Sequence, residues 1–367
     1  MDAKRQNHRQ LGVLVVGVGF LGRQRAAAAK AAQGTRLVAV MDANASLADR
    51  VARQLDVTAV TTLDEGLALH DVDAVIVATP HTDHDEVVRR ALDAGKHVLC
   101  EKPLATDPEE ARDLAQRADA AGLRLATGFN HRFYTPVQDA LALVSAWKIG
   151  RVESVRLSIG HAATPEFLAS WHGDRAVSGG GTIMDNGVHA CDLARKFLGE
   201  VVAAKGYLRD SIGLPFGIES EAFALFRNHE RGVAEVRSSW TLESGYLTIE
   251  VRGSAGHLKV ETAPWRLSGR LADGVILDRR YVAQRLFEKV YRRRFGCERS
   301  LVLELDDFAT RNSDKPQASA TGWDGARATE MADAVYRAAV SGSEIELTPP
   351  IVRAPSQRPL VHEPRYV

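Results

Sequence analysis

The sequence predicts an α/β half followed by an α+β half, and the order of its apolar segments is the main reason. From Leu11 to Thr127, short apolar runs alternate with helical stretches, which is typical of a doubly wound parallel sheet with right-handed crossovers. After residue 150, strands follow one another and alternate apolar with polar residues, which indicates a largely antiparallel, open-faced sheet. We therefore expect one domain at 1–133, a second at 134–349 and an extended tail at 350–367.

Length, charge and cysteine content exclude several classes of protein. The 367 residues suit two domains, and 47 basic side chains balance 47 acidic ones, so no global field favours nucleic acid or an anionic membrane. Three widely spaced cysteines predict reduced thiols and a cytoplasmic location. No apolar run approaches the ~18–20 residues of a membrane span, and the polar first ten residues predict no signal peptide.

A glycine-rich turn follows the first apolar run and precedes an alanine-rich helix. Its sequence, G-V-G-F-L-G from Gly17, is the dinucleotide fingerprint in the strand-to-helix context that this fingerprint requires. Gly17 would allow the tight turn, and Gly19 would let the backbone approach a pyrophosphate. The phosphate would lie at the helix N-terminus, beside Phe20 and Leu21.

The next apolar run ends at Asp42, twenty residues after Gly22. A carboxylate in this position accepts hydrogen bonds from an adenosine ribose diol, whereas a 2′-phosphate would meet like charge. No arginine follows in residues 43–45, so we expect NAD rather than NADP. The alternative is that Asp42 only caps the turn or the next helix.

Polar groups follow three further strands of the predicted parallel sheet, at Thr79-Pro80, at Glu101-Lys102-Pro103 and at 128–132. Ligands bind outside the carboxyl ends of such strands. Lys102, held extended by the following proline, could present its ammonium to a substrate oxygen, or it could be a solvated loop lysine. The His- and Asp-containing run at 81–85 has no convincing metal spacing, so His84 would lie near the nicotinamide ribose or cap the turn.

A second polar cluster follows three glycines in the α+β half. On a helix, Asp185, His189 and Asp192 would share one face because they are spaced i,i+4 and i,i+3. An Asp and a His one turn apart form an acid/base pair in which the carboxylate orients the ring, and a pKa near seven would suit proton transfer. The alternatives are a helix cap with a core histidine, or a zinc-binding trio.

These motifs, in this order, resemble the Gfo/Idh/MocA oxidoreductase family of glucose–fructose oxidoreductase and inositol dehydrogenase. The resemblance runs from Leu11 to about Leu347. It implies a Rossmann domain and a substrate domain, and a homodimer or homotetramer formed through the C-terminal sheet. It also implies NAD(P)-dependent oxidation of a ring hydroxyl of a sugar or cyclitol, or the reverse reduction.

The resemblance also implies residue roles. His189 would remove the hydroxyl proton, Lys102 would polarise that oxygen, and Asp185 would orient His189 or bind a neighbouring hydroxyl. No metal is implied. The cofactor-binding residues would be Gly17, Gly19, Phe20, Leu21, Asp42, Thr79, Pro80, His84, Glu101 and Lys102. The substrate-binding residues would be Lys102, Asn130, Arg132, Trp171, Asp185, Asn186 and His189.

Two other functions fit the same motifs. The chain could be a non-catalytic dinucleotide-binding sensor, although such a sensor has no need of the Lys102, Asp185 and His189 set. It could also run a closed oxidation–reduction cycle on a tightly held cofactor. The substrate would be chosen by loops at 162–174 and 211–218, whose shapes the sequence does not give.

Overall fold

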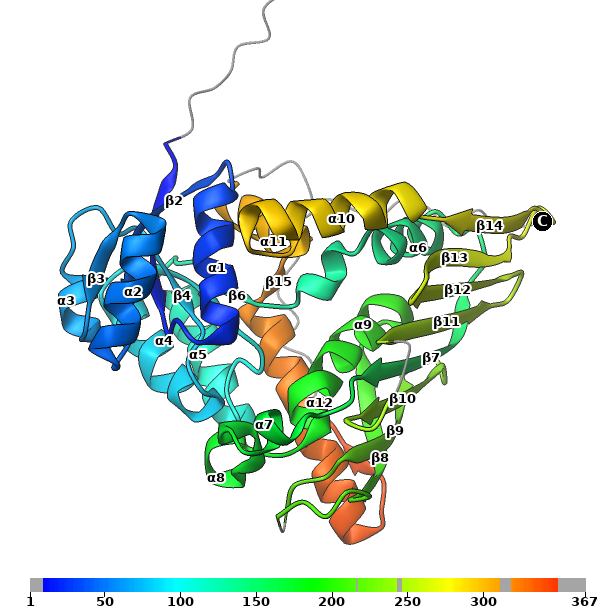
Figure 1. Cartoon of the computed structure of the whole chain (residues 1–367). Helices are drawn as coiled ribbons and strands as arrows, with labels where there is room; N and C mark the ends of the chain where they lie inside the picture. The colour runs from blue at the N-terminus through cyan, green and yellow to red at the C-terminus, as the bar shows by residue number, and fades with distance from the viewer. Residues whose placement is uncertain (1–8, 216, 243–245, 311–317, 349–367) are drawn as a thin grey trace, which may run out of the picture.

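Two β-sheets lie side by side in the computed structural model, which describes residues 9–215, 217–242, 246–310 and 318–348 (Figure 1). The first sheet has seven strands and the second has nine. This arrangement confirms the predicted parallel sheet and the predicted largely antiparallel sheet. The tail expected at 350–367 lies outside the described residues.

The first sheet is parallel apart from one short edge strand, and its order is β15-β6-β5-β4-β1-β2-β3. Its central strands are apolar and fully buried because helices cover both faces. The strands are β1 Leu11–Val16, β2 Thr35–Met41, β3 Thr58–Val60, β4 Ala74–Val77, β5 His97–Cys100, β6 Leu125–Thr127 and β15 Ala320–Thr321. The helices between them are α1 Phe20–Ala31, α2 Ala45–Leu55, α3 Leu63–Leu67, α4 His84–Asp93 and α5 Pro108–Ala120.

The order of strands reverses between β1 and β4. The chain leaves β1 toward β2 on one side, whereas β4, β5 and β6 follow on the other side. Open α/β sheets bind their ligands at such a switch point, outside the carboxyl ends of the strands. Here the switch point brings Gly17, after β1, against Ala78, after β4.

The second sheet has the order β14-β13-β12-β11-β7-β10-β9-β8-β16, and only β7 and β10 pair in parallel. Three of its strands were not predicted. In β13 Trp265–Arg270 and β14 Ile276–Arg280, polar and charged residues do not alternate clearly with apolar ones, and β16 Ile345–Glu346 has only two residues. The other strands are β7 Val152–Gly160, β8 Val201–Arg209, β9 Glu221–Asn228, β10 Val233–Ser239, β11 Leu247–Gly253 and β12 His257–Thr262.

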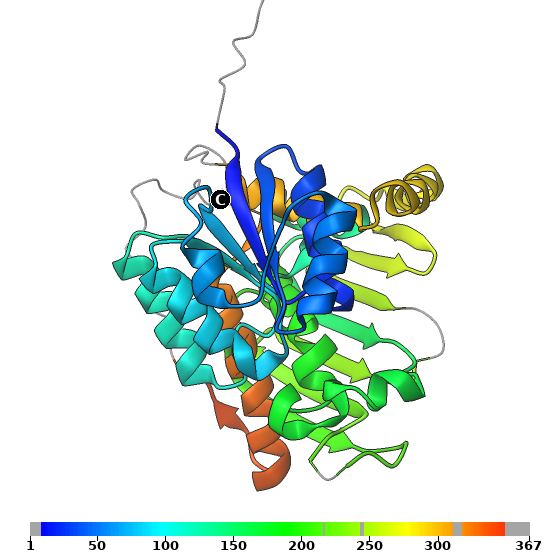
Figure 2. The same ribbon diagram turned by 60° about the vertical axis from the view of Figure 1, so that its left-hand side comes forward.

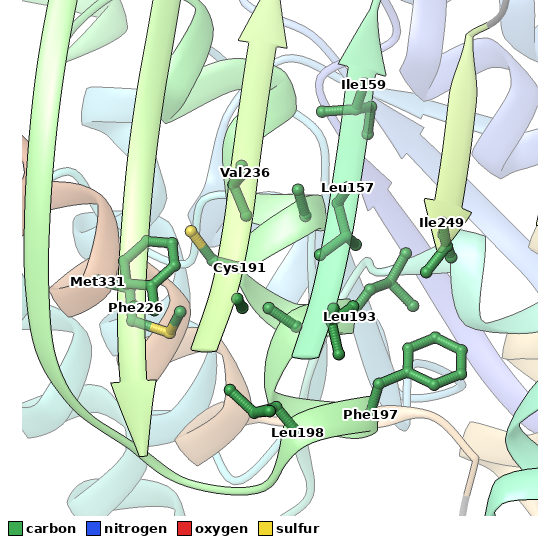
Figure 3. Packing of buried hydrophobic residues seen from close by; sticks show 14 of the residues in the cluster. Leu157, Ile159, Cys191, Leu193, Phe197, Leu198, Phe226, Val236, Ile249 and Met331 are labelled. Atoms are coloured by element: carbon green, nitrogen blue, oxygen red, sulfur yellow. The ribbon is translucent and has the colours of Figure 1, made fainter. Parts of the chain in front are cut away.

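Helices cover one face of the second sheet. Figure 3 shows Leu193 and Phe197 of α9 (Val188–Leu198) packed against Leu157 of β7 and Ile249 of β11. Helices α6 (Thr135–Ser145) and α12 (Gly322–Ser341) complete this apolar layer. The opposite face carries exposed side chains, so one face is open, as predicted.

The last part of the chain joins the two sheets. Helix α11 (Arg299–Ala309) packs on α1, and β15 pairs with β6 of the first sheet. Helix α12 then runs between the sheets and contacts both α5 and β8 (Figure 2). A domain boundary after residue 133 stays a prediction, but the second half of the chain returns to complete the first sheet.

Helix α10 (Val282–Phe295) has no buried residue, which agrees with a solvated position for its run of three arginines. Within the ranges that the structure describes, no helix is long and apolar enough to cross a bilayer.

Candidate functional site at the sheet edge

The glycine turn after β1 has the shape that a bound pyrophosphate needs. Gly17 has a φ of +82°, and a Cβ there would lie 2.6 Å from the Ala78 carbonyl oxygen. A Cβ on Gly19 would meet nothing within 4 Å, so the space outside the turn is open. Helix α1 begins there without a side-chain cap or an acidic residue in its first turn. Its N-terminus therefore suits an anion, with Phe20 exposed and Leu21 partly exposed beside it.

Asp42, after β2, holds the glycine turn in place. One carboxylate oxygen accepts the Val18 amide at 3.0 Å, and the other accepts the Asn44 amide at 2.9 Å. The cap of α2 is Asn44, whose side chain accepts the Leu47 amide. Asp42 stays partly exposed, and each of its oxygens retains a lone pair. A ribose diol therefore fits this carboxylate.

His84 lies behind the sheet edge rather than on it. The ring is fully buried; its Nδ1 is 2.7 Å from the Pro103 carbonyl oxygen, and its Nε2 is 3.0 Å from the Thr79 carbonyl oxygen. His84 was expected near the nicotinamide ribose or as a cap of the turn, and the structure shows that it ties the turn after β4 to the turn after β5. The hydroxyl of Thr79 is buried with no partner in the described chain, and Pro80 follows it toward the short 3₁₀ turn His81–Asp83.

Lys102 and Asp185 meet across the two halves of the chain. The Lys102 Nζ donates to Asp185 Oδ1 at 2.6 Å and to the Asp185 carbonyl oxygen at 3.0 Å. The second carboxylate oxygen of Asp185 accepts Asn186 Nδ2 and the buried Trp240 Nε1, each at 3.1 Å. Burial alone would raise the pKa of the Asp185 carboxyl, but Lys102 holds it well below its usual range.

His189 does not pair with Asp185. The π-helical turn Ile183–Gly187 precedes α9, and its wider winding separates the two side chains. His189 instead stacks on His131, with ring centroids 4.0 Å apart, and each ring has a buried Nδ1 without a hydrogen-bond partner among the described residues. Burial, with the neighbouring His131 and Lys102, holds the pKa of His189 well below its usual value, which corrects the expected pKa near seven.

Arg132 is part of a buried ion-pair cluster and does not line the site. It is 3% exposed, and its guanidinium binds Asp192, with Nε 2.7 Å from Oδ2, and Asp324 at 3.3 Å. The expectation that this arginine binds the substrate is therefore corrected. Asp192 is held in the same ion pair, so it is not part of the predicted trio on one helix face. Asn130 is partly exposed and donates to the Ser300 hydroxyl at 3.0 Å.

Arg25 lies behind the sheet edge that carries Lys102, and the sequence analysis did not select it. The side chain is completely buried; its Nε is 2.5 Å from Glu101 Oε1, and its Nη1 is 2.5 Å from Glu304 Oε2 of α11. Burial raises the pKa of Glu304 to about 7 despite this contact. Glu101 also accepts the Lys102 amide at 3.3 Å, so Arg25 supports the turn that carries Lys102.

A stack of rings flanks the Lys102–Asp185 pair. The segment with α7 (Pro165–Leu168) and the turn Trp171–Gly173 stacks Trp171 on His172 and His172 on Phe167, with centroids 3.7 Å and 4.0 Å apart. Phe167 in turn contacts Trp240, edge to face. Trp171 is partly exposed, as a platform would need.

His131 and Trp240 also belong to the site, although the sequence analysis did not include them. His131 lies in the 128–132 segment that was noticed for its polarity, next to two residues that were chosen. Trp240 follows β10 directly. Their partners are distant in the sequence, and no local spacing could have connected them. In the described ranges, no three His, Cys, Asp or Glu side chains are gathered as a metal site.

Two family models match the chain. "Oxidoreductase family, NAD-binding Rossmann fold" matches residues 11–129, and "GFO/IDH/MocA C-terminal domain" matches residues 137–259. The 1,5-anhydro-D-fructose reductase of Ensifer adhaerens is 29% identical over 91% of this chain and 97% of that protein. An inositol 2-dehydrogenase of Gluconacetobacter diazotrophicus is 30% identical over 90% of this chain and 95% of that protein.

Solved structures share the fold. A levoglucosan dehydrogenase in complex with NADH superposes with a TM-score of 0.80 at 22% identity, over 93% of this chain and all of that one. With both halves matched and the glycine turn and Asp42 in place, the chain belongs to the Gfo/Idh/MocA family of oxidoreductases and carries an NAD-binding Rossmann domain.

Proposed function

We propose that this protein is an NAD-dependent oxidoreductase that transfers hydride between a ring hydroxyl, or the matching ketone, of a sugar or cyclitol and the nicotinamide. The relatives named for anhydrofructose reduction and inositol oxidation support this substrate class. The single observation that carries the mechanism is the contact of Lys102 with Asp185, because it anchors an ammonium beside the sheet edge.

Lys102 holds the reacting oxygen. An ammonium has three donors, and the side chain and the carbonyl of Asp185 take two of them. The third is left for a substrate oxygen. In oxidation, this donor stabilises the negative charge that develops on the oxygen as its proton leaves, and it fixes the position of the carbon beside that oxygen.

His189 takes the proton. Its lowered pKa keeps the imidazole neutral at pH 7, so one ring nitrogen has a free lone pair. We assign the transfer to Nε2, since Nδ1 is enclosed. The hydroxyl proton passes to this nitrogen, and the C–H electron pair leaves as hydride, which NAD accepts when it is bound. In reduction, His189 returns the proton.

Asp185 acts through Lys102. Its carboxylate receives three side-chain donors, from Lys102, Asn186 and Trp240, and is therefore well occupied. We infer that Asp185 positions the lysine and keeps it charged rather than orienting His189. This differs from the role that the family resemblance implies.

The test is to mix the protein with NAD and a panel of sugars and inositols while following nicotinamide absorbance at 340 nm. We expect turnover of at least one compound, and Lys102→Ala should lower its rate about 1,000-fold while NADH still binds. NADH binding without turnover of any compound in either direction would favour the non-catalytic sensor instead. Nucleotide that stays bound through purification would favour the closed cycle.

We further propose that the open face of the second sheet joins copies of this chain into a dimer or tetramer. Tyr207 and Phe223 are paired across β8 and β9 and are 69% and 39% exposed, and Leu225 beside them is 49% exposed. An apolar group of this kind on an open sheet face marks an interface. Light scattering should give a molecular mass that is a multiple of the chain mass of 39.9 kDa. The Leu225→Glu substitution should reduce this measured mass.

A further inference from the structure

We propose that the substrate of this site is an uncharged polyol, and that the site rejects sugars of the same shape that carry a carboxylate or a phosphate. The inference rests on the proposed function, because it concerns the same site, and it narrows the substrate class. The charges around Lys102 carry the argument.

The ammonium of Lys102 is already paired with a carboxylate. Lys102 lies 2.6 Å from Asp185, and both side chains are almost enclosed. Trp240 and Asn186 hold the other oxygen of the same carboxylate, so Asp185 cannot turn away without leaving buried donors unpaired. An anionic substrate would therefore meet a lysine that has one donor left, with the like-charged Asp185 carboxylate directly beside it.

The two arginines nearest the sheet edge that carries Lys102 are not available to an anionic ligand either. Arg25 is fully buried between Glu101 and Glu304. Arg132 is buried between Asp192 and Asp324. Each guanidinium is buried against two acidic side chains, so neither is placed to bind an anionic ligand.

The histidines around the lysine supply hydrogen bonds without charge. Burial lowers the pKa of all five, to about 4 for His172 and to about 3 for His131, and Lys102 opposes their protonation as well. They are His81, His131, His161, His172 and His189. At neutral pH these rings are neutral donors and acceptors, which suits hydroxyl groups.

Tyr134 and Tyr246 adjoin the site, because both rings contact the ring of His131. Burial raises the pKa of both phenols, and Glu298 contributes to the rise in each case, with Asp185 adding to it at Tyr246. In the described chain, then, the charges beside this site are the Lys102–Asp185 ion pair, Glu298, and the buried Arg25, which is itself paired with Glu101 and Glu304. A second anion from the substrate would have no partner there.

The remaining polar and aromatic side chains of the site suit a neutral ring with hydroxyl groups. Asn186 lies between Asp185 and His161, with its Nδ2 3.2 Å from His161 Nδ1. The partly exposed Trp171, stacked on His172, offers an apolar face to the C–H side of a sugar ring.

The experiment compares matched pairs of substrates with the full chain and NAD. The pairs are D-glucose with D-glucuronate, D-galactose with D-galacturonate, and myo-inositol with myo-inositol 1-phosphate. For every pair whose neutral member turns over, we expect kcat/KM for the anion to be lower by about 100-fold or more. An anion within tenfold of its neutral partner, or turnover of anions alone, would overturn the inference. No turnover by any compound would overturn the proposed function and this inference with it.

A charge variant gives a second readout. His161→Arg adds a cation beside Asn186, and His161→Gln is the matched uncharged control. We expect the ratio of anion to neutral kcat/KM to rise by about tenfold or more with arginine and to stay near the wild-type value with glutamine, because the missing element is charge. An equal ratio in both variants, or a rise with glutamine, would count against the inference.

Discussion

The two ends of the site are built in opposite ways. At the Lys102 end, the ammonium and the Asp185 carboxylate are tied into a network that includes Trp240. At the His189 end, the ring lies on His131 and makes no hydrogen bond through its buried Nδ1 within the described chain. A residue that fixes an oxygen must itself be fixed, whereas a residue that takes up and returns a proton needs a free lone pair, which we assign to Nε2 of His189.

The difference also explains why two buried charges and one buried neutral ring coexist here. The Asp185 carboxylate at 2.6 Å compensates the Lys102 ammonium for its loss of hydration. His189 has no such carboxylate, so burial favours its neutral form.

Lys102→Ala should have the largest effect. Loss of the donor that stabilises the developing charge should lower kcat about 1,000-fold, the upper range for removing one such donor. The measurement is the steady-state rate, with an NADH titration followed by fluorescence to show that the cofactor still binds. A thermal melt controls for folding, since the variant leaves Asp185 without its cation. An unchanged rate would remove Lys102 from the mechanism.

His189→Gln should lower kcat/KM by about 100-fold or more, the usual contribution of a general base. The pH profile sharpens the test. In oxidation, His189 must be unprotonated, so the wild-type rate should fall on acidification, with the limb below pH 6.5 because the pKa of His189 is lowered. In the direction of reduction, the dependence of the rate on pH should be the reverse, because His189 must then be protonated. The variant should lose this limb, and a variant that keeps it would point to another base.

Trp240→Phe should have a smaller effect that is confined to the Lys102 end. It removes the indole donor to Asp185 and leaves the buried ring volume nearly filled. A hydrogen bond to a charged group is worth about 1.5–3 kcal/mol, so we expect kcat to fall about tenfold while the acidic limb stays in place. Trp147→Phe, at an exposed position, is the matched control and should not change the rate. A shifted acidic limb in Trp240→Phe would mean that the two ends are not separate.

Asp42→Ala should have the smallest effect on the chemical step. We expect KM for NAD to rise about tenfold and discrimination against NADP to relax, because the carboxylate would no longer bind the ribose diol or repel a 2′-phosphate. The rate at saturating NAD should change little. If the substitution changed neither the affinity for NAD nor the affinity for NADP, Asp42 would be purely structural, as the holder of the glycine turn.

Features that depend on local sequence could be predicted, and those that depend on distant partners could not. The glycine turn, Asp42 and the segment around Lys102 follow from strand ends and turn residues, which are close together in the chain. Arg25 follows the glycine turn on a helix that gives no hint that its partners are Glu101 and Glu304. Its burial arises only when α11 returns to pack on α1.

The helix around Asp185 illustrates the same limit. A spacing of four residues predicts a shared face only for a regular α-helix, and the π-helical turn at 183–187 breaks that rule. Spacing therefore predicted that Asp185 and His189 pair with each other, whereas the structure gives each of them another partner. The true partners, Lys102 and His131, come from the first half of the chain.

The most direct test of the account is a double-mutant cycle on Lys102→Ala and His189→Gln, measured as kcat/KM for oxidation of the best substrate. If both residues act on one oxygen in one transition state, the double variant should be no more than about tenfold worse than the poorer single variant, as for groups that act as a unit. If the two losses multiply in full, Lys102 and His189 act independently, and the claim that they converge on one oxygen is contradicted.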